Sequence, residues 1–213
     1  MTPYYDEDGI TIYHGDCRDV LPGVEFDVVV TDPPYGIAYE QTIDGARNFG
    51  PITGDDTDEL AAWVVNCTTV PRIVFGANHF PHVLPAPGRW VCWDKRLTPA
   101  ADRMVGSPFE LAWCSGEHKA GIMYRVLHGG VVNADKANSP RFHPTQKPVT
   151  LMTRIINDLT VGVVADPFMG SGSTLVAAKN LNRHAVGIEV EERYCEIAAR
   201  RLAQGVLKLE VSA

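Results

Sequence analysis

The architecture of this chain is indicated most clearly by Val163-Val164-Ala165-Asp166-Pro167-Phe168-Met169-Gly170-Ser171-Gly172-Ser173-Thr174. This segment reads as a short apolar strand, a glycine-rich turn and a helix that begins near Ser173. Gly170 and Gly172 permit positive φ and close approach of a ligand, and the free N–H groups at the helix start favour a carboxylate or a phosphate. About twenty residues further on, a second predicted strand ends at Glu189, whose carboxylate is well placed to accept hydrogen bonds from ribose hydroxyls. The pattern predicts a nucleoside-cofactor site.

Strands and helices alternate on both sides of this motif. Apolar, strand-like runs occur at residues 26–31, 72–75, 90–93, 109–113, 163–165 and 185–188. Helical patterns lie at residues 58–69, 149–159, 173–181 and 191–203. Short, continuously apolar strands are typical of a sheet that is covered on both faces. We therefore predict an α/β fold with a Rossmann-like, doubly wound, mostly parallel sheet, in a single domain over residues 1–213.

Length and composition place the chain among ordinary globular domains. It has 213 residues, of which 45% are hydrophobic and 21% charged. No apolar run approaches the ~20 residues of a membrane helix, and the acidic opening at residues 1–8 is unlike a signal peptide, so we expect a cytoplasmic protein without a membrane partner. The five cysteines are scattered and show no zinc-site spacing, which favours reduced, mostly buried thiols.

The charge is unevenly distributed along the chain. The net charge is −7, yet residues 72–147 carry 10 basic and 5 acidic side chains and five of the seven histidines. A basic segment inside an acidic chain can hold a localised polyanion site, although a solvated surface would give the same asymmetry. Candidates for phosphate contacts are Lys95, Arg96, Lys119, Arg125, Lys136 and Arg141. So few cations predict a modest, strongly salt-dependent affinity for nucleic acid.

A second motif, Thr31-Asp32-Pro33-Pro34-Tyr35, directly follows the predicted strand at 26–31. It therefore lies at the carboxyl edge of the sheet, where open α/β folds bind ligands. The Asp32 carboxylate and the Pro33 carbonyl are acceptors in a corner made rigid by two prolines, which suits gripping the two N–H groups of a planar aromatic amine. Tyr35 could stack on such a base. On its own, an Asp-Pro-Pro corner is more often a simple strand-ending turn.

Together the two motifs resemble those of the amino-group DNA methyltransferases, which transfer a methyl group from S-adenosylmethionine to adenine N6 or cytosine N4. The catalytic motif precedes the cofactor motif, which is similar to the circularly permuted order of the β group, and the family has the class I methyltransferase fold. Two further segments resemble family elements in the same order: Tyr13-His14-Gly15-Asp16-Cys17 and His143-Pro144-Thr145-Gln146-Lys147-Pro148. The resemblance therefore spans nearly the whole chain.

The resemblance implies which residues form the site. It places Asp32, Pro33, Pro34 and Tyr35 at the target amine. It places these residues around S-adenosylmethionine: Asp16, Lys147, Asp166, Phe168, Gly170, Gly172, Ser173 and Glu189. Within the fourth segment, Pro148 also suits the first turn of the helix at 149–159, with Thr145 as a capping residue.

The implied reaction is methyl transfer to the exocyclic amine of a base flipped out of DNA, without a metal and without a covalent enzyme intermediate. Asp32, where cytosine N4 enzymes often carry Ser, favours adenine N6. The alternatives are a cytosine N4 enzyme, an RNA or protein amide methyltransferase, or a catalytically silent nucleic-acid-binding subunit. A nicotinamide dehydrogenase is disfavoured, because Leu175 stands where a third glycine is expected.

The chain is short for this family. Target recognition falls to a short insert at residues 115–142, and the β group often forms homodimers, so a homodimer is a further expectation. Members of the family act in restriction-modification. The pair His79 and His82 has metal-ligand spacing, but no third ligand is spaced to complete a site.

Overall fold

The structure is a computed structural model that describes residues 1–38, 52–85, 87–96, 107–116, 120–129, 132–133 and 145–204. Nine strands of this part form one sheet in the order β1-β2-β11-β10-β3-β4-β6-β5-β7. Their bounds are β1 Tyr5–Glu7, β2 Ile10–His14, β3 Val28–Thr31, β4 Arg72–Phe75, β5 Gly88–Asp94, β6 Phe109–Ser115, β7 Ile122–Arg125, β10 Val164–Asp166 and β11 Ala185–Glu189. A separate two-stranded ribbon pairs β8 (His128–Gly129) with β9 (Val132–Asn133).

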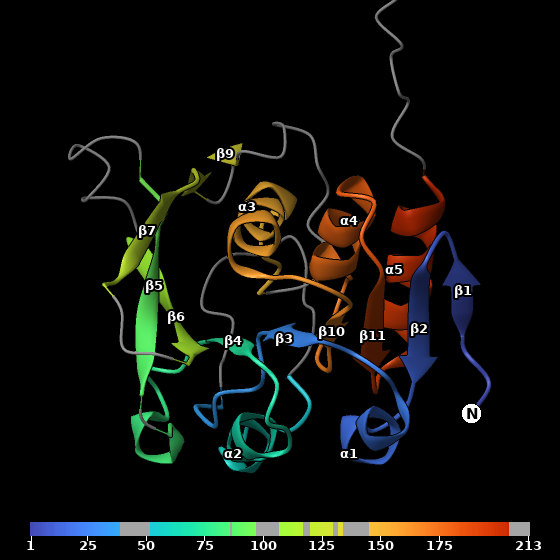
Figure 1. The fold of residues 1–213 in the computed structure, drawn as a ribbon, viewed down its shortest axis with the longest axis horizontal. Coiled ribbons are helices and arrows are strands. Elements are labelled where there is room, and N and C mark those ends of the chain that lie inside the picture. Colours follow the sequence, from blue (N-terminus) through green and yellow to red (C-terminus); the bar gives the residue numbers. More distant parts are fainter. Residues whose placement is uncertain are drawn as a thin grey trace, which may run out of the picture.

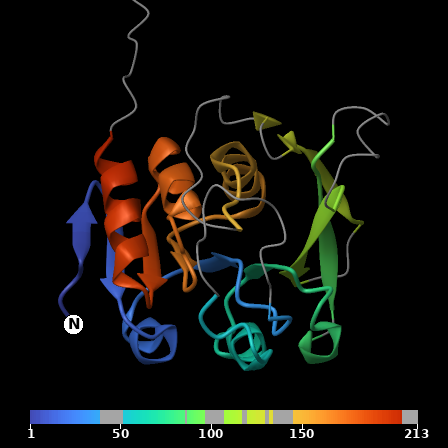
Figure 2. The same cartoon turned by 180° about the vertical axis from the view of Figure 1, so that it is seen from behind.

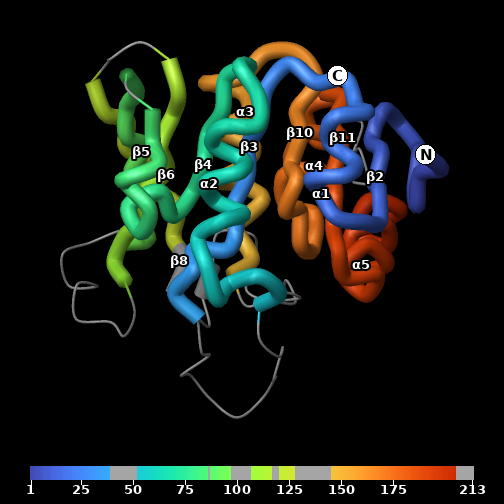
Figure 3. Tube along the Cα trace, turned by 90° about the horizontal axis from the view of Figure 1, so that it is seen from below, coloured from blue at the N-terminus to red at the C-terminus, as the bar shows by residue number. Residues whose placement is uncertain are grey.

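Helices cover both faces of the sheet. The α-helices are α1 Cys17–Val20, α2 Glu59–Asn66, α3 Val149–Leu159, α4 Ser173–Asn180 and α5 Glu192–Ala203, and the 3-10 turns are Leu21–Gly23 and Pro81–Val83. The first two α-helices lie below the sheet and the last three above it (Figure 1), an arrangement that is equally clear from behind (Figure 2). Seen from below, the N-terminal strands and α5 occupy one end of the molecule and β5 and β6 the other (Figure 3).

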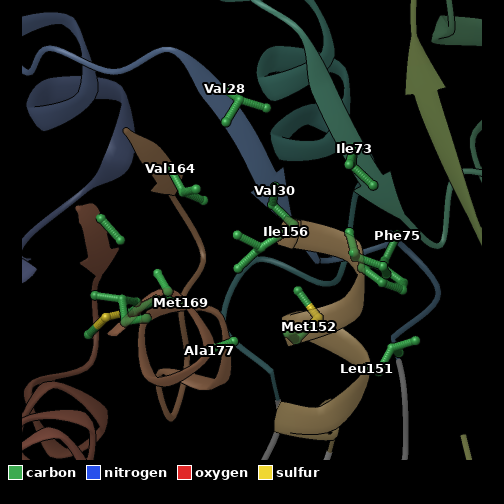
Figure 4. Close-up of a cluster of buried hydrophobic side chains, with 14 of the residues drawn as sticks. Val28, Val30, Ile73, Phe75, Leu151, Met152, Ile156, Val164, Met169 and Ala177 are labelled. Atoms are coloured by element: carbon green, nitrogen blue, oxygen red, sulfur yellow. The ribbon is translucent and has the colours of Figure 1, made fainter. Parts of the chain in front are cut away.

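Each face of the sheet has its own apolar core. Above the sheet, α3 and α4 pack on the inward-facing side chains of β3, β4 and β10, and Figure 4 shows Met152 and Ile156 of α3 turned toward Val30. Below it, Val64 and Val65 of α2 pack in a cluster with Val29 and Val74 of the central strands. Because the central strands are covered twice, β3 is buried along its whole length, as its continuous apolar run requires.

The predicted fold class is confirmed. β2, β11, β10, β3 and β4 run parallel to their neighbours within this group, whereas β1 and β6 are antiparallel to theirs. β10 lies between β11 and β3, so a strand from the end of the chain sits beside one from its beginning. From β10 and β3 the strand order continues in opposite directions, through β11 and β2 on one side and through β4 on the other. Such a reversal opens a crevice at the carboxyl ends of the strands.

Most predicted elements are present, with some differences at their ends. The strand expected at 26–31 begins at Val28, and the helix expected at 58–69 spans only Glu59–Asn66. The cap of α3 was predicted wrongly: the N-cap residue is Pro148, with an extended ψ of 134°, and not Thr145. β2, α1 and β7 were not predicted. Within the described ranges we find no helix with the length and apolarity of a membrane span.

Candidate active site

A cleft of about 870 Å³ opens at the carboxyl edge of the sheet. Eleven of the twelve predicted site residues line it: Asp16, Asp32, Pro33, Pro34, Tyr35, Lys147, Asp166, Phe168, Gly170, Ser173 and Glu189. The cleft is within the size range of cofactor pockets. The structure therefore brings both motifs to one cavity, with the catalytic corner after β3 and the glycine-rich turn after β10.

Gly172 is the predicted site residue that does not line the cleft. It is the N-cap of α4, with a left-handed φ of 78°. A Cβ at this position would come within 2.8 Å of the Cβ of Ala198, which belongs to α5. A glycine is therefore needed at position 172, both for the left-handed turn and for the packing of α4 against α5.

The two carboxylate oxygens of Asp32 each meet a donor from the protein. The Tyr35 hydroxyl donates a short hydrogen bond to Oδ1, and the Lys147 ammonium donates another to Oδ2. Burial raises the pKa of Asp32, with the charge of Lys147 acting in the opposite direction. Lys147, predicted at the cofactor, thus lies against the carboxylate of Asp32.

Lys147 also faces a second carboxylate, that of Glu110 on β6. Its Nζ lies 3.3 Å from Glu110 Oε2, while Lys95 Nζ lies 2.5 Å from Glu110 Oε1. Burial acts against the charge of Glu110, but Lys147 and Lys95 outweigh burial and lower its pKa to about 2. Burial likewise disfavours the Lys147 ammonium, and the charges of Asp32 and Glu110 overcome it and raise the pKa of Lys147. Acidic and basic side chains therefore alternate along this wall of the cleft.

The turn that follows the two prolines is held by Asp55. Its Oδ1 accepts hydrogen bonds from the backbone N–H of Tyr35 at 2.7 Å and of Gly36 at 3.0 Å. Gly36 has φ of 74°, and a Cβ there would lie 2.6 Å from the backbone nitrogen of Asp58. Asp55 is buried, so this carboxylate fixes the catalytic corner from beneath.

The Tyr35 ring is fixed by neighbours from the segment after β4. It stacks on His79 with centroids 5.0 Å apart and an interplanar angle of 11°. A Cβ on Gly76 would come within 2.0 Å of the same ring. One face of Tyr35 is therefore already covered by His79, which is exposed and also lines the cleft.

The glycine-rich turn brings two further carboxylates to the cleft. Asp166 Oδ1 accepts a hydrogen bond from Thr31 Oγ1 at 2.7 Å and one from Phe168 N at 3.2 Å. Burial raises the pKa of Asp166 to about 6. The Thr31 bond joins the ends of β3 and β10 directly, and so ties the strand that carries Asp32 to the strand of the cofactor motif.

Glu189, at the end of β11, supports the turn from the other side. Its Oε2 accepts a hydrogen bond from Gly170 N at 3.0 Å, and its Oε1 accepts one from Glu191 N at 2.8 Å. Burial raises the pKa of Glu189 to about 7. Gly170 is held with φ of 49°, as the sequence predicts for this turn.

Asp16 lies at the far end of the cleft and caps α1. Its Oδ1 accepts a hydrogen bond from Arg18 N at 2.8 Å, and its Oδ2 lies 2.6 Å from Arg18 Nη2. These bonds to Arg18 lower the pKa of Asp16, which keeps the carboxylate ionised. Asp16 is thus an oriented acceptor at the cleft wall.

The donor set of this cleft fits S-adenosylmethionine. Asp166 is buried and Glu189 is half-buried, and within the described ranges neither carboxylate forms an ion pair with a basic side chain. A buried carboxylate without a cation favours a ligand that brings hydroxyl donors or positive charge. S-adenosylmethionine brings both, as ribose hydroxyls, an amino group and a sulfonium. Phe168, Gly170 and Ser173 form the adjoining floor of the cleft.

Sequence reasoning missed three residues of this site: Glu110, Asp55 and His79. Glu110 had a usable signal, because it is a charged residue inside the apolar run Phe109-Glu110-Leu111-Ala112-Trp113. Asp55 lies in a segment without periodicity and makes its contacts with backbone N–H groups, which no motif marks. The spacing of His79 and His82 indicates only a metal site, whereas His82 Nε2 lies 2.9 Å from Asp58 Oδ2.

The predicted phosphate contacts are only partly described. Lys95 pairs with Glu110, whereas Arg96 and Arg125 lie 3.0 Å and 3.4 Å from the two oxygens of Asp94. Lys119, Lys136 and Arg141 lie outside the described residues, as do His143 and Pro144. Within the predicted insert at 115–142, β7 extends the main sheet beside β5, and residues 117–119, 130–131 and 134–142 also fall outside the described ranges.

Known proteins resemble this chain in both sequence and fold. A model of the N6/N4 methyltransferases, described as DNA methylase, matches residues 108–200. The chain is 32% identical over 212 residues to Putative methylase YubD of Escherichia coli (strain K12), with 89% of this chain and 88% of that protein covered. It is 26% identical over 256 residues to Type II methyltransferase M.ScaI of Streptomyces caespitosus, with 94% and 83% covered.

Solved structures show the same fold. The PvuII DNA methyltransferase (cytosine-N4-specific) superposes with a TM-score of 0.64 at 16% identity, over 99% of this chain and 90% of that one. The M1.HpyAVI–SAM complex superposes with a TM-score of 0.57 at 23% identity, over 91% and 98%. The resemblance drawn from the motifs is thereby confirmed. The chain belongs to the N6/N4 DNA methylase family, the amino-group DNA methyltransferases that depend on S-adenosylmethionine.

Proposed function

We propose that this cleft methylates the N6 amine of adenine, on a base that has left the DNA duplex. The observation that carries the proposal is the hydrogen bond of 2.7 Å between Thr31 and Asp166, which places the catalytic corner one strand away from the cofactor turn. S-adenosylmethionine, when bound, supplies an electrophilic methyl group on its sulfonium. An amine held at Asp32 therefore lies within the same cleft as that methyl group.

The corner after β3 would prepare the amine for attack. The lone pair of an aromatic amine is delocalised into its ring, so acceptors on both N–H groups are needed to draw the nitrogen toward tetrahedral geometry. The Asp32 carboxylate supplies one acceptor and the Pro33 carbonyl the other. Pro34 fixes the direction of the turn, and Asp55 holds it from beneath. Positioning and hydrogen bonding provide the rate enhancement in this proposal.

Asp32 is also suited to take up the proton that the methylated amine releases. Burial raises its pKa above that of an ordinary aspartate, which makes it a better base. Lys147 keeps its proton, because Asp32 and Glu110 raise its pKa. The proton therefore passes to Asp32 Oδ1 or Oδ2, and the lysine stays protonated.

The cofactor would lie between the ends of β2, β10 and β11. Glu189 and Asp166 would accept hydrogen bonds from the cofactor's donors, Asp16 would face its adenine, and Gly170 and Ser173 would receive its carboxylate at the start of α4. Phe168 packs on it, and Gly172 shapes the turn. Lys147 lies at the methyl-transfer end, where its contact with Asp32 supports a role at the target amine as well as at the cofactor.

Adenine N6 is favoured over cytosine N4 by the carboxylate at position 32. A carboxylate accepts more strongly than the serine hydroxyl that many cytosine N4 enzymes carry there. Residues 115–142 are the proposed target-recognition insert, and a homodimer remains part of the proposal because this insert is short.

The test is to incubate the purified chain with methyl-labelled S-adenosylmethionine and unmethylated genomic DNA, and then to analyse the digested nucleosides by mass spectrometry. We expect N6-methyladenine. N4-methylcytosine would retain the reaction class and overturn the target atom. Neither product, with cofactor binding shown by calorimetry, would favour an RNA or protein substrate or a catalytically silent subunit.

A further inference from the structure

Lys147 and the target amine compete for the carboxylate of Asp32. Lys147 already donates to Oδ2 and the Tyr35 hydroxyl to Oδ1, so both oxygens are engaged before any base arrives. As the amine nitrogen bonds to the methyl carbon it gains positive charge. An ammonium fixed on the same carboxylate opposes that charge and weakens Asp32 as an acceptor.

The carboxylate of Glu110 is a second acceptor for the Lys147 ammonium. Its Oε1 is held by Lys95 at 2.5 Å, which anchors the carboxylate. Its Oε2 is fully buried and forms an ion pair with Lys147 Nζ at 3.3 Å, but no donor of the described residues meets it with hydrogen-bond geometry. A buried acceptor without a donor is costly, and one in a functional cleft calls for an explanation.

We propose that Glu110 is a positioning residue for methyl transfer, which takes over the Lys147 ammonium when the target amine binds at Asp32 Oδ2. The exchange is one of hydrogen bonds, and no proton changes place. Asp32 is released for the amine, Glu110 Oε2 gains its missing donor, and Lys147 stays paired throughout. The inference rests on the proposed role of Asp32 at the amine.

The geometry favours this exchange over a purely structural role. Lys147 lies between Asp32 and Glu110, so a small rotation of its side chain transfers the ammonium from one carboxylate to the other. Glu110 and Asp32 come from β6 and the end of β3, on either side of β4, and both residues line the cleft. A merely structural ion pair would not require one oxygen of Glu110 to remain without a donor.

The first test is Glu110→Gln, compared with wild type and with Glu25→Gln. Glu25 is an exposed residue before β3, at the opposite edge of the sheet, so it controls for loss of one negative charge. We expect the single-turnover rate at saturating cofactor and DNA to fall at least about tenfold in Glu110→Gln, because Lys147 remains on Asp32. The affinities for cofactor and DNA should change less than about twofold, and Glu25→Gln should match wild type.

The second test removes the Lys147 ammonium from the Glu110→Gln variant. The double variant Glu110→Gln/Lys147→Gln should transfer methyl groups faster than Glu110→Gln alone, since no ammonium then occupies Asp32. A rate within about twofold of wild type for Glu110→Gln would overturn the proposal, as would a double variant no faster than Glu110→Gln. The same assay measures methylation by wild type. Failure of the proposed function is therefore distinguished from failure of the exchange at Glu110.

A folding defect in Glu110→Gln would be recognised by a lowered melting temperature or loss of cofactor binding. Glu110→Asp then replaces it, because this variant keeps the charge beside Lys95 and withdraws the carboxylate from Lys147 by one methylene. The same loss of rate is expected. A wild-type rate in Glu110→Asp would count against the exchange, because the shortened side chain cannot receive the ammonium in the same way.

Discussion

Asp32, Asp166 and Glu189 lie at the ends of neighbouring strands, and their carboxylates differ in their partners. Asp32 meets a lysine and a tyrosine hydroxyl, whereas Asp166 and Glu189 meet hydroxyl and backbone N–H donors. Within the described residues Asp166 and Glu189 have no basic partner, which favours a ligand that brings its own positive charge.

Replacing Asp32 should separate transfer from cofactor binding. We expect Asp32→Ala to lower the transfer rate by about 10²-fold or more, because the amine loses its acceptor and its base. Cofactor affinity, measured by calorimetry, should stay within a few fold, since Asp166 and Glu189 are unchanged. Loss of both properties together would instead place Asp32 in the cofactor site or in the fold.

Glu189 should make cofactor binding depend on pH. Its pKa is about 7 in the free protein, and its ionised form is the better partner for ribose hydroxyls and a sulfonium. The ionised fraction falls from about 90% at pH 8 to about 10% at pH 6, so the Kd should rise about tenfold between these values. Calorimetric titrations at both pH values measure this change.

The matched variant for this experiment is Glu189→Gln. It should bind the cofactor more weakly at pH 8 and lose most of the pH dependence between pH 8 and 6. Asp166, whose pKa is about 6, accounts for the dependence that remains. An unchanged pH dependence in Glu189→Gln would assign it to another group.

Individual side-chain contacts were the hardest part of the site to predict. The motifs specify which residues gather at the cleft, because strand ends and a glycine-rich turn fix backbone positions. They do not specify that Lys147 reaches Asp32, since 115 positions separate the two residues and the contact depends on where the segment before α3 crosses the sheet. Glu110 and Asp55 act through similar long-range contacts, which sequence spacing cannot reveal.

At the scale of elements, the well-predicted helices and strands are those with a strong pattern. α3 was predicted at its observed bounds because it has an apolar face that packs on the sheet. α4 was predicted to within one residue because the glycine-rich turn fixes where it begins. β2 and β7 were missed, since runs of five and four residues are too short for their pattern to be decisive. Pairing with β11 and β5 stabilises them as strands.

The junction of α4 and α5 can be tested with Gly172→Ala. The new Cβ would lie 2.8 Å from Ala198, at a residue with φ of 78°. We expect the free energy of unfolding to fall by about 2 kcal/mol, from overpacking together with the left-handed backbone. Chemical denaturation measures this change.

Gly23→Ala is the control for that measurement, because a Cβ at Gly23 would meet no atom within 4 Å. Its effect should be within about 0.5 kcal/mol. Equal effects at both glycines would show that the contact between Gly172 and Ala198 contributes little to stability.

For the whole molecule, the net charge of −7 means that DNA must be met by a local group of cations. Arg96 and Arg125 share Asp94 at the carboxyl ends of β5 and β7, on the edge of the sheet where the cleft opens. Asp94 therefore neutralises part of their charge. The modest, salt-dependent affinity expected from the sequence stays a prediction.

Arg125→Ala should weaken DNA binding by a similar factor for all sequences. Arg125 is 64% exposed, so it can reach a phosphate, and its loss should lower the slope of log K against log salt by about 0.9. Fluorescence anisotropy over a range of salt concentrations measures the slope. Arg200→Ala, near the end of α5 farthest from the cleft, should leave it unchanged, and an equal change in both variants would argue against a contact by Arg125.

The placement of β10 and β11 between β2 and β3 also matters while the protein is being made. β2 and β3 leave the ribosome early, yet the two strands that must lie between them are among the last to be synthesised. In a nascent chain β2 and β3 therefore lack the strands that will lie between them, and their apolar edges stay exposed for several seconds of translation. Until β10 and β11 are in place the cleft lacks Asp166 and Glu189, so a partly synthesised chain does not have the complete site.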